Sequence, residues 1–231
     1  MTIGIIGAMD EEIAKLMENM RDVKEESIAN CLFAEGTLKG TDVVVLKSGI
    51  GKVNAAMAAT IMHERYHPSY VINTGSAGGH SAELEVGDIV ISNRVVHHDV
   101  DVTAFGYAYG QVPGLPSMFD ADAQLVSIAI KAAKGMGLRY AEGIIATGDT
   151  FMEDPSKVEE VNKKFPAMLA MEMEAAAIAQ VCSQYEVPFV IIRALSDIAG
   201  KESSVSFDAF LEKAADNAAG LIMEMVQDIQ K

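Results

Sequence analysis

Short runs of β-branched and aliphatic residues alternate along this chain with longer segments that have the apolar period of a helix. The strand-like runs are TIGIIGA (2–8), DVVVLKS (42–48), YVINTG (70–75), DIVISN (88–93), GIIATG (143–148), AMLAMEM (167–173) and FVIIRALS (189–196). The helical segments are 11–20, 53–66, 122–136, 155–165, 175–185 and 207–229. Strands that are apolar throughout need helices on both faces, which is typical of α/β proteins. We therefore expect a three-layer α/β/α sandwich with a central, twisted, mixed but largely parallel sheet.

Size and charge restrict the class of partner. A chain of 231 residues that is 50% hydrophobic can bury a large core, and no linker or repeat divides it, so we expect one domain over residues 1–231. The net charge of -15 opposes nucleic acid and anionic membranes, which attract basic surfaces. A small, neutral or cationic ligand fits better.

Targeting signals are not evident in the sequence. The start, MTIGIIGAMDEE, lacks the basic and apolar regions of a signal peptide, and no stretch of about 18 apolar residues suggests a membrane span. The two cysteines, Cys31 and Cys182, lie far apart without metal-ligand spacing, which favours buried thiols in a reducing compartment. We expect a cytoplasmic protein.

The segment from residue 97 to residue 120, HHDVDVTAFGYAYGQVPGLPSMFD, is the one long stretch without a helix or strand pattern. Loops of this length in compact domains are usually functional. We expect it to form a substrate wall or an interface.

Polar side chains follow several predicted strands at the point where each strand ends. In open α/β sheets, ligands bind beyond the carboxyl ends of the strands, so these residues should gather on one rim. They are Met9, Asp10, Glu11 and Glu12 after the first strand, then Ser76, then Asp149, Thr150 and Phe151, then Glu174, and finally Arg193 and Asp197.

Two separated carboxyl groups are what hydrolysis of a glycosidic bond requires, one as general acid and one as general base. Glu12 opens a helix, where the helix dipole favours the ionised form that a base needs. Asp197 follows Ser196 at the end of a buried strand, where burial would favour the protonated form that an acid needs. Glu174 could stabilise positive charge on a ribosyl ring, and Arg193 could balance the carboxylates.

The stretch MEMEAAAIA (171–179) raises a question of burial, because Glu172 and Glu174 precede an alanine-rich helix. A buried carboxylate needs a partner, a proton or a ligand. We interpret Glu172 as a neighbouring site residue that supports Glu174 or a water molecule.

Ordinary structural explanations compete with each of these roles. Glu12 could only complement the helix dipole, Asp197 could only cap a turn, and Phe151, Met173 and Phe207 could be core residues. The motif GIGKVNAA (49–56) could suggest a dinucleotide-binding loop, but its third glycine position holds Asn. The motif HHDVD (97–101) could suggest a metal site, but neighbours on an extended segment point to alternate sides. We therefore expect no metal and no cofactor.

Motifs along the whole chain resemble one known family. They are similar to those of the 5′-methylthioadenosine/S-adenosylhomocysteine nucleosidases, within the superfamily that includes purine nucleoside and uridine phosphorylases. The motifs are IGIIGAMDEE, LKSGIGKVNAA, INTGSAGG, HDVDVTAFGYAYGQVPG, TGDTF, MEMEAAAIAQVC and VPFVIIRALSD. TGSAGG is common to the superfamily, whereas HDVDVTAFGY, MEMEA and RALSD together are specific to the nucleosidases.

The resemblance implies a homodimer that hydrolyses methylthioadenosine, S-adenosylhomocysteine and 5′-deoxyadenosine to adenine and the 5′-substituted ribose, with a place in methionine salvage and nucleoside catabolism. It implies that Glu12 activates water, with Ser76 and Arg193, and that Asp197, positioned by Ser196, protonates adenine N7. It implies that Met173 and Glu174 contact the ribose, and that Phe151 and the backbone of Met152 contact adenine. The 5′ group is implied to contact Met9, Ile50 and Phe207, together with four residues from the 97–120 loop of the partner subunit: Val102, Phe105, Tyr107 and Pro113.

Two rival functions remain open. A phosphorylase would use phosphate in place of water, and phosphate binding usually draws Arg, Lys or backbone amides. The expected rim offers Arg193 among several carboxylates, which favours hydrolysis. A nucleoside-binding protein without turnover would not need the set Glu12, Glu174 and Asp197.

Overall fold

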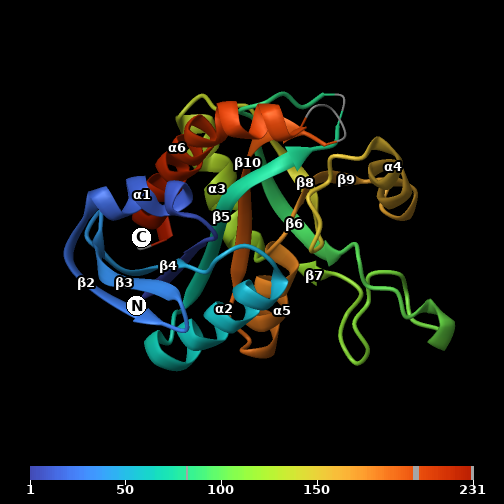
Figure 1. Ribbon diagram of the computed structural model, residues 1–231. Helices are drawn as coiled ribbons and strands as arrows, with labels where there is room; N and C mark the ends of the chain where they lie inside the picture. Colours follow the sequence, from blue (N-terminus) through green and yellow to red (C-terminus); the bar gives the residue numbers. More distant parts are fainter. Residues whose placement is uncertain (82, 200–202, 230–231) are drawn as a thin grey trace.

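A single mixed sheet is the framework of the computed structural model, which describes residues 1–81, 83–199 and 203–229 (Figure 1). Its strands are β1 (Ile3–Gly7), β2 (Met20–Ile28), β3 (Cys31–Leu38), β4 (Thr41–Lys47), β5 (Tyr70–Gly79), β6 (Ile89–His97), β7 (Phe119–Asp120), β8 (Tyr140–Thr147), β9 (Met168–Glu172) and β10 (Phe189–Ile198). The helices are α1 (Asp10–Asn19), α2 (Lys52–Tyr66), η1 (Thr103–Phe105, 3-10), α3 (Ala123–Gly135), α4 (Pro155–Lys164), α5 (Ala175–Gln184) and α6 (Ser203–Ile229). Every predicted strand and helix is therefore present.

Three strands were not expected from the sequence. β2 and β3 form an antiparallel extension of the sheet beyond β4, and β7 is a two-residue strand on β6. Most of β2 is exposed and charged, so it has no apolar alternation that could mark it as a strand. Charged side chains on such an edge strand protect it from pairing with other chains.

The sheet is mixed, as expected, but the expectation that it is largely parallel needs correction. Of the ten pairings between described strands, five are antiparallel. Two of these five lie in the central part of the sheet, where β10 pairs with β6 and β5 pairs with β9. Apolar strand patterns do not encode direction, so the sequence could not distinguish these pairings.

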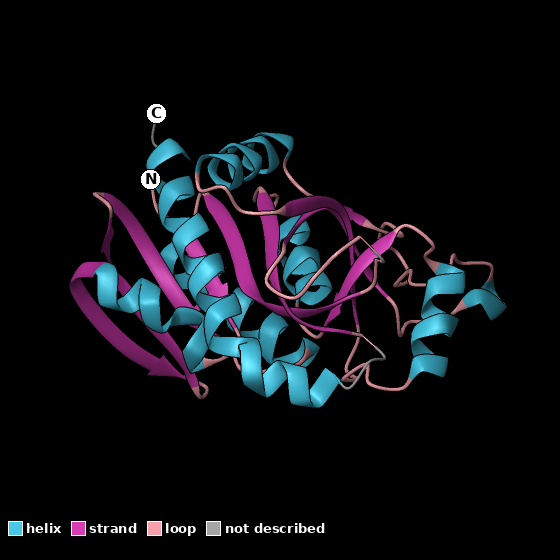
Figure 2. Ribbon diagram, turned by 90° about the horizontal axis from the view of Figure 1, so that it is seen from above, coloured by secondary structure: helices cyan, strands magenta, loops and turns pink. Residues whose placement is uncertain are grey.

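Helices cover the two faces of the sheet, and neighbouring strand residues point to opposite faces. Val190 and Ile192 of β10 belong to a core cluster with α1, α3 and α6, whereas Ile191 between them packs with α2 and α5. This alternation is the side-chain period of a strand buried on both sides. Figure 2 shows the helices on either side of the strands.

The sheet curls strongly around β5 and β10. β5 pairs with β1, β9 and β10, and β10 pairs in addition with β6, so the pairings run from β5 through β10, β6, β8 and β9 back to β5. Close approach at the end of β5 depends on glycine, because a Cβ on Gly79 would lie 2.6 Å from Leu195 Cδ1. The curl gathers the ends of β5, β9 and β10 at one place.

The segment expected to be irregular, residues 97–120, connects β6 to α3 and contains only η1 and β7. It projects from the body of the molecule (Figure 1). None of the helices in the described ranges has both the length and the apolar character to cross a bilayer.

Candidate active site

Glu12 lies in the first turn of α1, just beyond the end of β1. Its Oε2 accepts hydrogen bonds from the backbone N–H groups of Ala8 at 2.7 Å and Met9 at 3.3 Å. Its Oε1 accepts from the N–H of Ser76 at 2.9 Å and from the Ser76 hydroxyl at 3.2 Å. Four donors therefore hold this carboxylate in one orientation. The bond to Met9 is an ordinary capping interaction, but the bonds to Ser76, at the distant strand β5, are not explained by capping.

Glu172, the last residue of β9, has the partners that its burial requires. Its carboxylate accepts from the Thr147 hydroxyl, from the Arg193 guanidinium, and from the backbone N–H groups of Glu174 at 2.9 Å and Ala175 at 2.8 Å. It therefore satisfies the first N–H groups of α5 and forms a buried ion pair. These contacts agree with a supporting role toward Glu174.

Glu174 has fewer partners than its neighbour. Its Oε1 accepts from the Gly51 N–H at 2.8 Å, and its Oε2 lies 3.6 Å from Arg193 Nη2. Burial raises the pKa of Glu174 to about 8, repulsion from Glu172 adds to this, and Arg193 opposes it. This carboxyl group is therefore the one most in need of hydrogen-bond donors from a ligand.

Arg193 is fully buried behind the three carboxylates. Besides Glu172 it donates to the Thr74 carbonyl and to Asn73 Oδ1, each at 2.9 Å. A Cβ on Gly75 would lie 1.9 Å from Arg193 Nη1 and 2.7 Å from Glu12 Oε1, so the absence of a side chain lets these groups converge. Arg193 forms ion pairs with Glu172 and Glu174, and its expected role beside a water molecule stays a prediction.

Asp197 is buried near the end of β10, where it is placed by two features. Ser196 Oγ donates to Asp197 Oδ1 at 2.9 Å. A Cβ on Gly78 would lie 3.0 Å from Asp197 Oδ2, so β5 passes close to this carboxyl group. That Ser196 positions Asp197 for proton transfer stays a prediction.

A cavity of about 410 Å³ lies in front of these groups. A second cavity, of about 30 Å³, shares four of its wall residues and reaches Met152 and Asp197. Phe151 lies in both walls and meets Phe207 edge to face, with 6.0 Å between the ring centroids. The predicted residues in the wall of the larger cavity are Met9, Glu12, Ile50, Ser76, Phe151, Glu172, Met173, Glu174 and Phe207.

Three residues of the site were not predicted from the sequence. Ala8 and Met171 also line the larger cavity, and Gly51 supplies the N–H to Glu174. The signal for Gly51 was the glycine pair in GIGK, which marks a close approach of backbone. Nothing in the sequence distinguished Met171 from a core residue.

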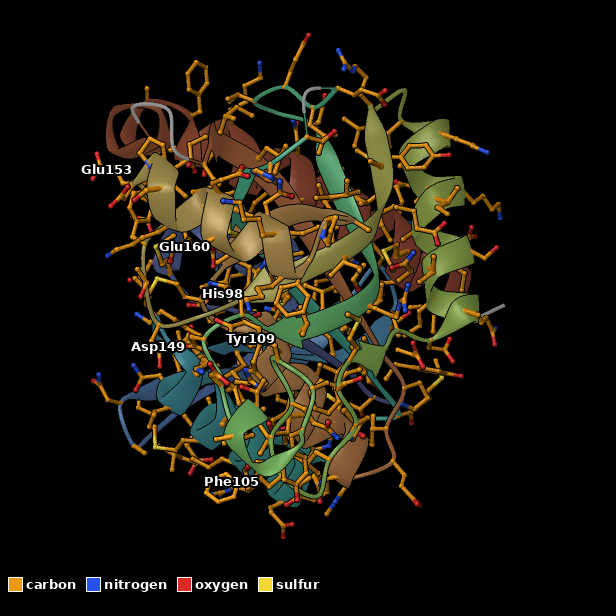
Figure 3. The ribbon with its side chains drawn as sticks, turned by 90° about the vertical axis from the view of Figure 1, so that its right-hand side faces the viewer. His98, Phe105, Tyr109, Asp149, Glu153 and Glu160 are labelled. Carbon is orange, nitrogen blue, oxygen red and sulfur yellow. The ribbon has the colours of Figure 1, made fainter. Side chains whose placement is uncertain are left out.

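Four predicted residues lie away from this cavity. They belong to the projecting loop, and none of them lines the cavity of its own chain: Val102, Phe105, Tyr107 and Pro113. Phe105 is 82% exposed, and Figure 3 shows it on the outer part of the loop, well separated from Glu153. Their contribution to a partner's pocket stays a prediction.

Three side chains of the HHDVD motif, those of His97, Asp99 and Asp101, have partners other than a metal ion. His97 Nε2 lies 3.1 Å from Gln180 Oε1, Asp99 pairs with Lys52, and Asp101 accepts from the N–H and hydroxyl of Thr103. Within the ranges that the structure covers, no group of three or more His, Cys, Asp or Glu side chains is arranged to hold a metal ion.

Comparison with known proteins places this geometry in a family. The model of the phosphorylase superfamily matches residues 2–227. The 5′-methylthioadenosine/S-adenosylhomocysteine nucleosidase of Geobacillus sp. (strain WCH70) is 61% identical over the whole of both chains, and that of Bacillus subtilis (strain 168) is 56% identical over 99% of this chain and all of the other. The crystal structure of the Neisseria meningitidis nucleosidase in complex with methylthio-immucillin-A superposes with a TM-score of 0.97 at 49% identity, covering 98% of this chain and 99% of that one. The chain therefore belongs to the phosphorylase superfamily and, within it, to the 5′-methylthioadenosine/S-adenosylhomocysteine nucleosidases.

Proposed function

We propose that this protein hydrolyses the N-glycosidic bond of 5′-methylthioadenosine and S-adenosylhomocysteine, and also of 5′-deoxyadenosine, to release adenine and the 5′-substituted ribose. The observation that carries the proposal is the pair of adjoining cavities, with Glu12 and Glu174 on the larger one and Asp197 on the smaller one. The names of relatives that match over their full length support the same reaction.

Glu12 acts as the general base for water. A water molecule next to its carboxylate would lie among the Ser76 hydroxyl and backbone donors that already hold the group in place. As the glycosidic bond lengthens and C1′ becomes electron-poor, Glu12 takes a proton from the attacking water.

Asp197 acts as the general acid. The smaller cavity places it beside Phe151 and Met152, which we assign to the face and the edge of adenine. A proton delivered to N7 lets adenine leave as a neutral molecule, and Ser196 keeps the carboxyl group oriented for this transfer.

Glu174 and Met173 hold the ribose. Hydroxyl groups of the sugar donate to Glu174, whose burial leaves it short of partners. Glu12 and Glu172 face one buried cation, Arg193, so carboxylates outnumber cations at the site, which favours the positive charge that develops on the ribosyl ring.

Hydrolysis is favoured over phosphorolysis by the charges around the cavity. No Lys or Arg is among the described residues that line it, and the guanidinium of Arg193 is already bonded to Glu172, Thr74 and Asn73. A phosphate dianion would have to approach several carboxylates without a free cation.

We further propose a homodimer in which the 97–120 loop, through Val102, Phe105, Tyr107 and Pro113, closes the partner's pocket around the 5′ substituent. What supports this is the exposure of Phe105, and of Val53 and Ile50 near the start of α2, where apolar groups would otherwise face water.

We also infer a three-layer α/β/α arrangement, since the helix groups pack on opposite faces of the sheet. A cytoplasmic role in methionine salvage and nucleoside catabolism completes the proposal, with the two buried free thiols as support for a reducing compartment.

Product analysis tests the reaction. The protein is incubated with methylthioadenosine, with and without phosphate, and the products are identified. Free adenine and free methylthioribose in both incubations are expected. A phosphate-dependent ribose 1-phosphate would identify a phosphorylase, and no release of adenine would leave only a binding protein.

A further inference from the structure

Three segments from distant parts of the chain meet at the start of α2, beside the cavity. Lys52 Nζ lies 2.6 Å from Asp99 Oδ1, and the backbone N–H of Asp149 donates to Asp99 Oδ2 at 3.0 Å. The carboxylate of Asp149 in turn accepts from the backbone N–H of Lys52 at 2.7 Å. The three residues close a ring of interactions that joins the ends of β6 and β8 to α2. Figure 3 shows Asp149 between α4 and α2.

This ring, Lys52–Asp99–Asp149, differs from an ordinary surface ion pair. The side chains of Lys52 and Asp99 are only 19% and 26% exposed, so solvent screens their attraction less than it would on an open surface. Burial alone would raise the pKa of Asp99, but the hydrogen bonds from Lys52 and from the Asp149 N–H outweigh it and hold the pKa below its ordinary value. Loss of the Lys52 ammonium would leave a half-buried carboxylate oxygen without its cation.

The ring touches the proposed site on two sides. Asp149 stands two residues before Phe151, in the irregular segment between β8 and α4. Gly51, directly before Lys52, donates its N–H to Glu174. Gly51 has a φ of 96°, and a Cβ there would lie 3.1 Å from Asp149 Oδ1, so the two segments are in close contact.

The irregular segment, residues 148–154, carries Phe151 between β8 and α4. The N–H of Gly148 donates to the Glu172 carbonyl at 3.1 Å, which ties the start of the segment to β9. Beyond Gly148 its backbone bonds are short-range, from the Thr150 N–H to the Gly148 carbonyl and from the Glu153 N–H to the Phe151 carbonyl. The contacts of Asp149 with Asp99 and Lys52 connect it to parts of the chain 50 and 97 residues away. The ring therefore adds a long-range anchor at Asp149, two residues before Phe151, to the Gly148 bond and to the packing of Met152 in the core.

We propose that Lys52, Asp99 and Asp149 are positioning residues that hold the Phe151 segment in place to bind the purine. The proposal rests on the nucleosidase activity proposed above and names no new reacting group. The Lys52 ammonium acts through Asp99 and the Asp149 segment, since Lys52 does not line either cavity. Glu12 keeps its contacts with Ala8, Met9 and Ser76 when the ring is opened, so the loss should appear in purine binding and not in the chemical step.

The test compares Lys52→Met with the unmodified protein by calorimetric titration of free adenine and by kcat and KM for methylthioadenosine. We expect Lys52→Met to weaken adenine binding and to raise KM by about tenfold, with kcat within about threefold of its original value. Lys52→Arg, which keeps the cation, should restore both constants. The control is Lys131→Met, which removes another 2.6 Å Lys–Asp pair, between α3 and α6.

Asp99→Asn is a second variant in case Lys52→Met folds poorly, and the double variant should weaken adenine binding no further than either single change. Unchanged adenine affinity in a folded variant, or a fall in kcat alone, would overturn the positioning role. Because adenine titration needs no turnover, a protein that binds adenine but does not hydrolyse the substrate would refute the proposed function without refuting the ring.

Discussion

Glu174→Gln should make the protein more stable at neutral pH, and the gain should grow as the pH rises. Burial raises the pKa of Glu174 from 4.5 to about 8. Below pH 4.5 the group is protonated in both the folded and the unfolded chain, so it has no effect. Between pH 4.5 and 8 the unfolded chain loses this proton while the folded chain keeps it, so the free energy of unfolding falls by about 1.4 kcal/mol per pH unit.

The magnitude at pH 7 follows from this slope. Over the 2.5 pH units from 4.5 to 7, Glu174 reduces the free energy of unfolding by about 3 kcal/mol. Glutamine has the same shape, keeps an oxygen for the Gly51 N–H and does not ionise. Any cost of placing its amide near Arg193 is independent of pH, so the change with pH isolates the effect of the charge.

The assay is denaturant unfolding of the unmodified protein and the variant at pH 5 and pH 7, at one protein concentration. The stability difference, variant minus unmodified, should increase by about 2 to 3 kcal/mol between these pH values, because a small part of the effect is already present at pH 5. Glu18→Gln makes the same chemical change at an exposed position of α1 and should alter stability by less than about 0.5 kcal/mol at either pH. A difference for Glu174→Gln that stays constant with pH would refute the reasoning.

Three further predictions address the acid, the loop and the packing. Asp197→Asn should slow adenine release on the order of 10²–10⁴-fold while a substrate analogue still binds, because the amide has no proton to deliver; near-normal turnover would remove Asp197 from this role. Phe105→Ala should change the ratio of KM values for substrates with long and short 5′ groups, and an unaltered ratio would contradict closure by the partner's loop. Gly75→Ala should lower stability by about 3 kcal/mol or more in thermal unfolding, because its Cβ would meet Arg193 Nη1, whereas Gly135→Ala has open space and should be neutral or stabilising; equal Tm values would contradict this.

The ends of the predicted strands were enough to predict which residues gather around the cavity. Glu12, Ser76, Phe151 and Glu174 each follow a predicted strand, and all four line one cavity. The sequence could not predict how the carboxylates share partners, because Arg193 is 19 residues from Glu174 and more than 180 from Glu12. Glu172 was expected to support Glu174 or a water molecule, but its partners could not be predicted: they are Thr147, Arg193 and the first N–H groups of α5.

Local pattern and tertiary structure thus determined different things. Apolar periodicity along the chain was enough to predict the α/β class and most elements. The buried face of a helix repeats every three or four residues and that of a strand every two, so the spacing of apolar residues distinguishes them. It did not predict β2, whose charged residues carry no such pattern, or the antiparallel pairings within the curled sheet. Strand direction, and the convergence of Glu12, Glu174 and Asp197, depend on contacts between residues far apart in sequence, and only the tertiary structure could decide them.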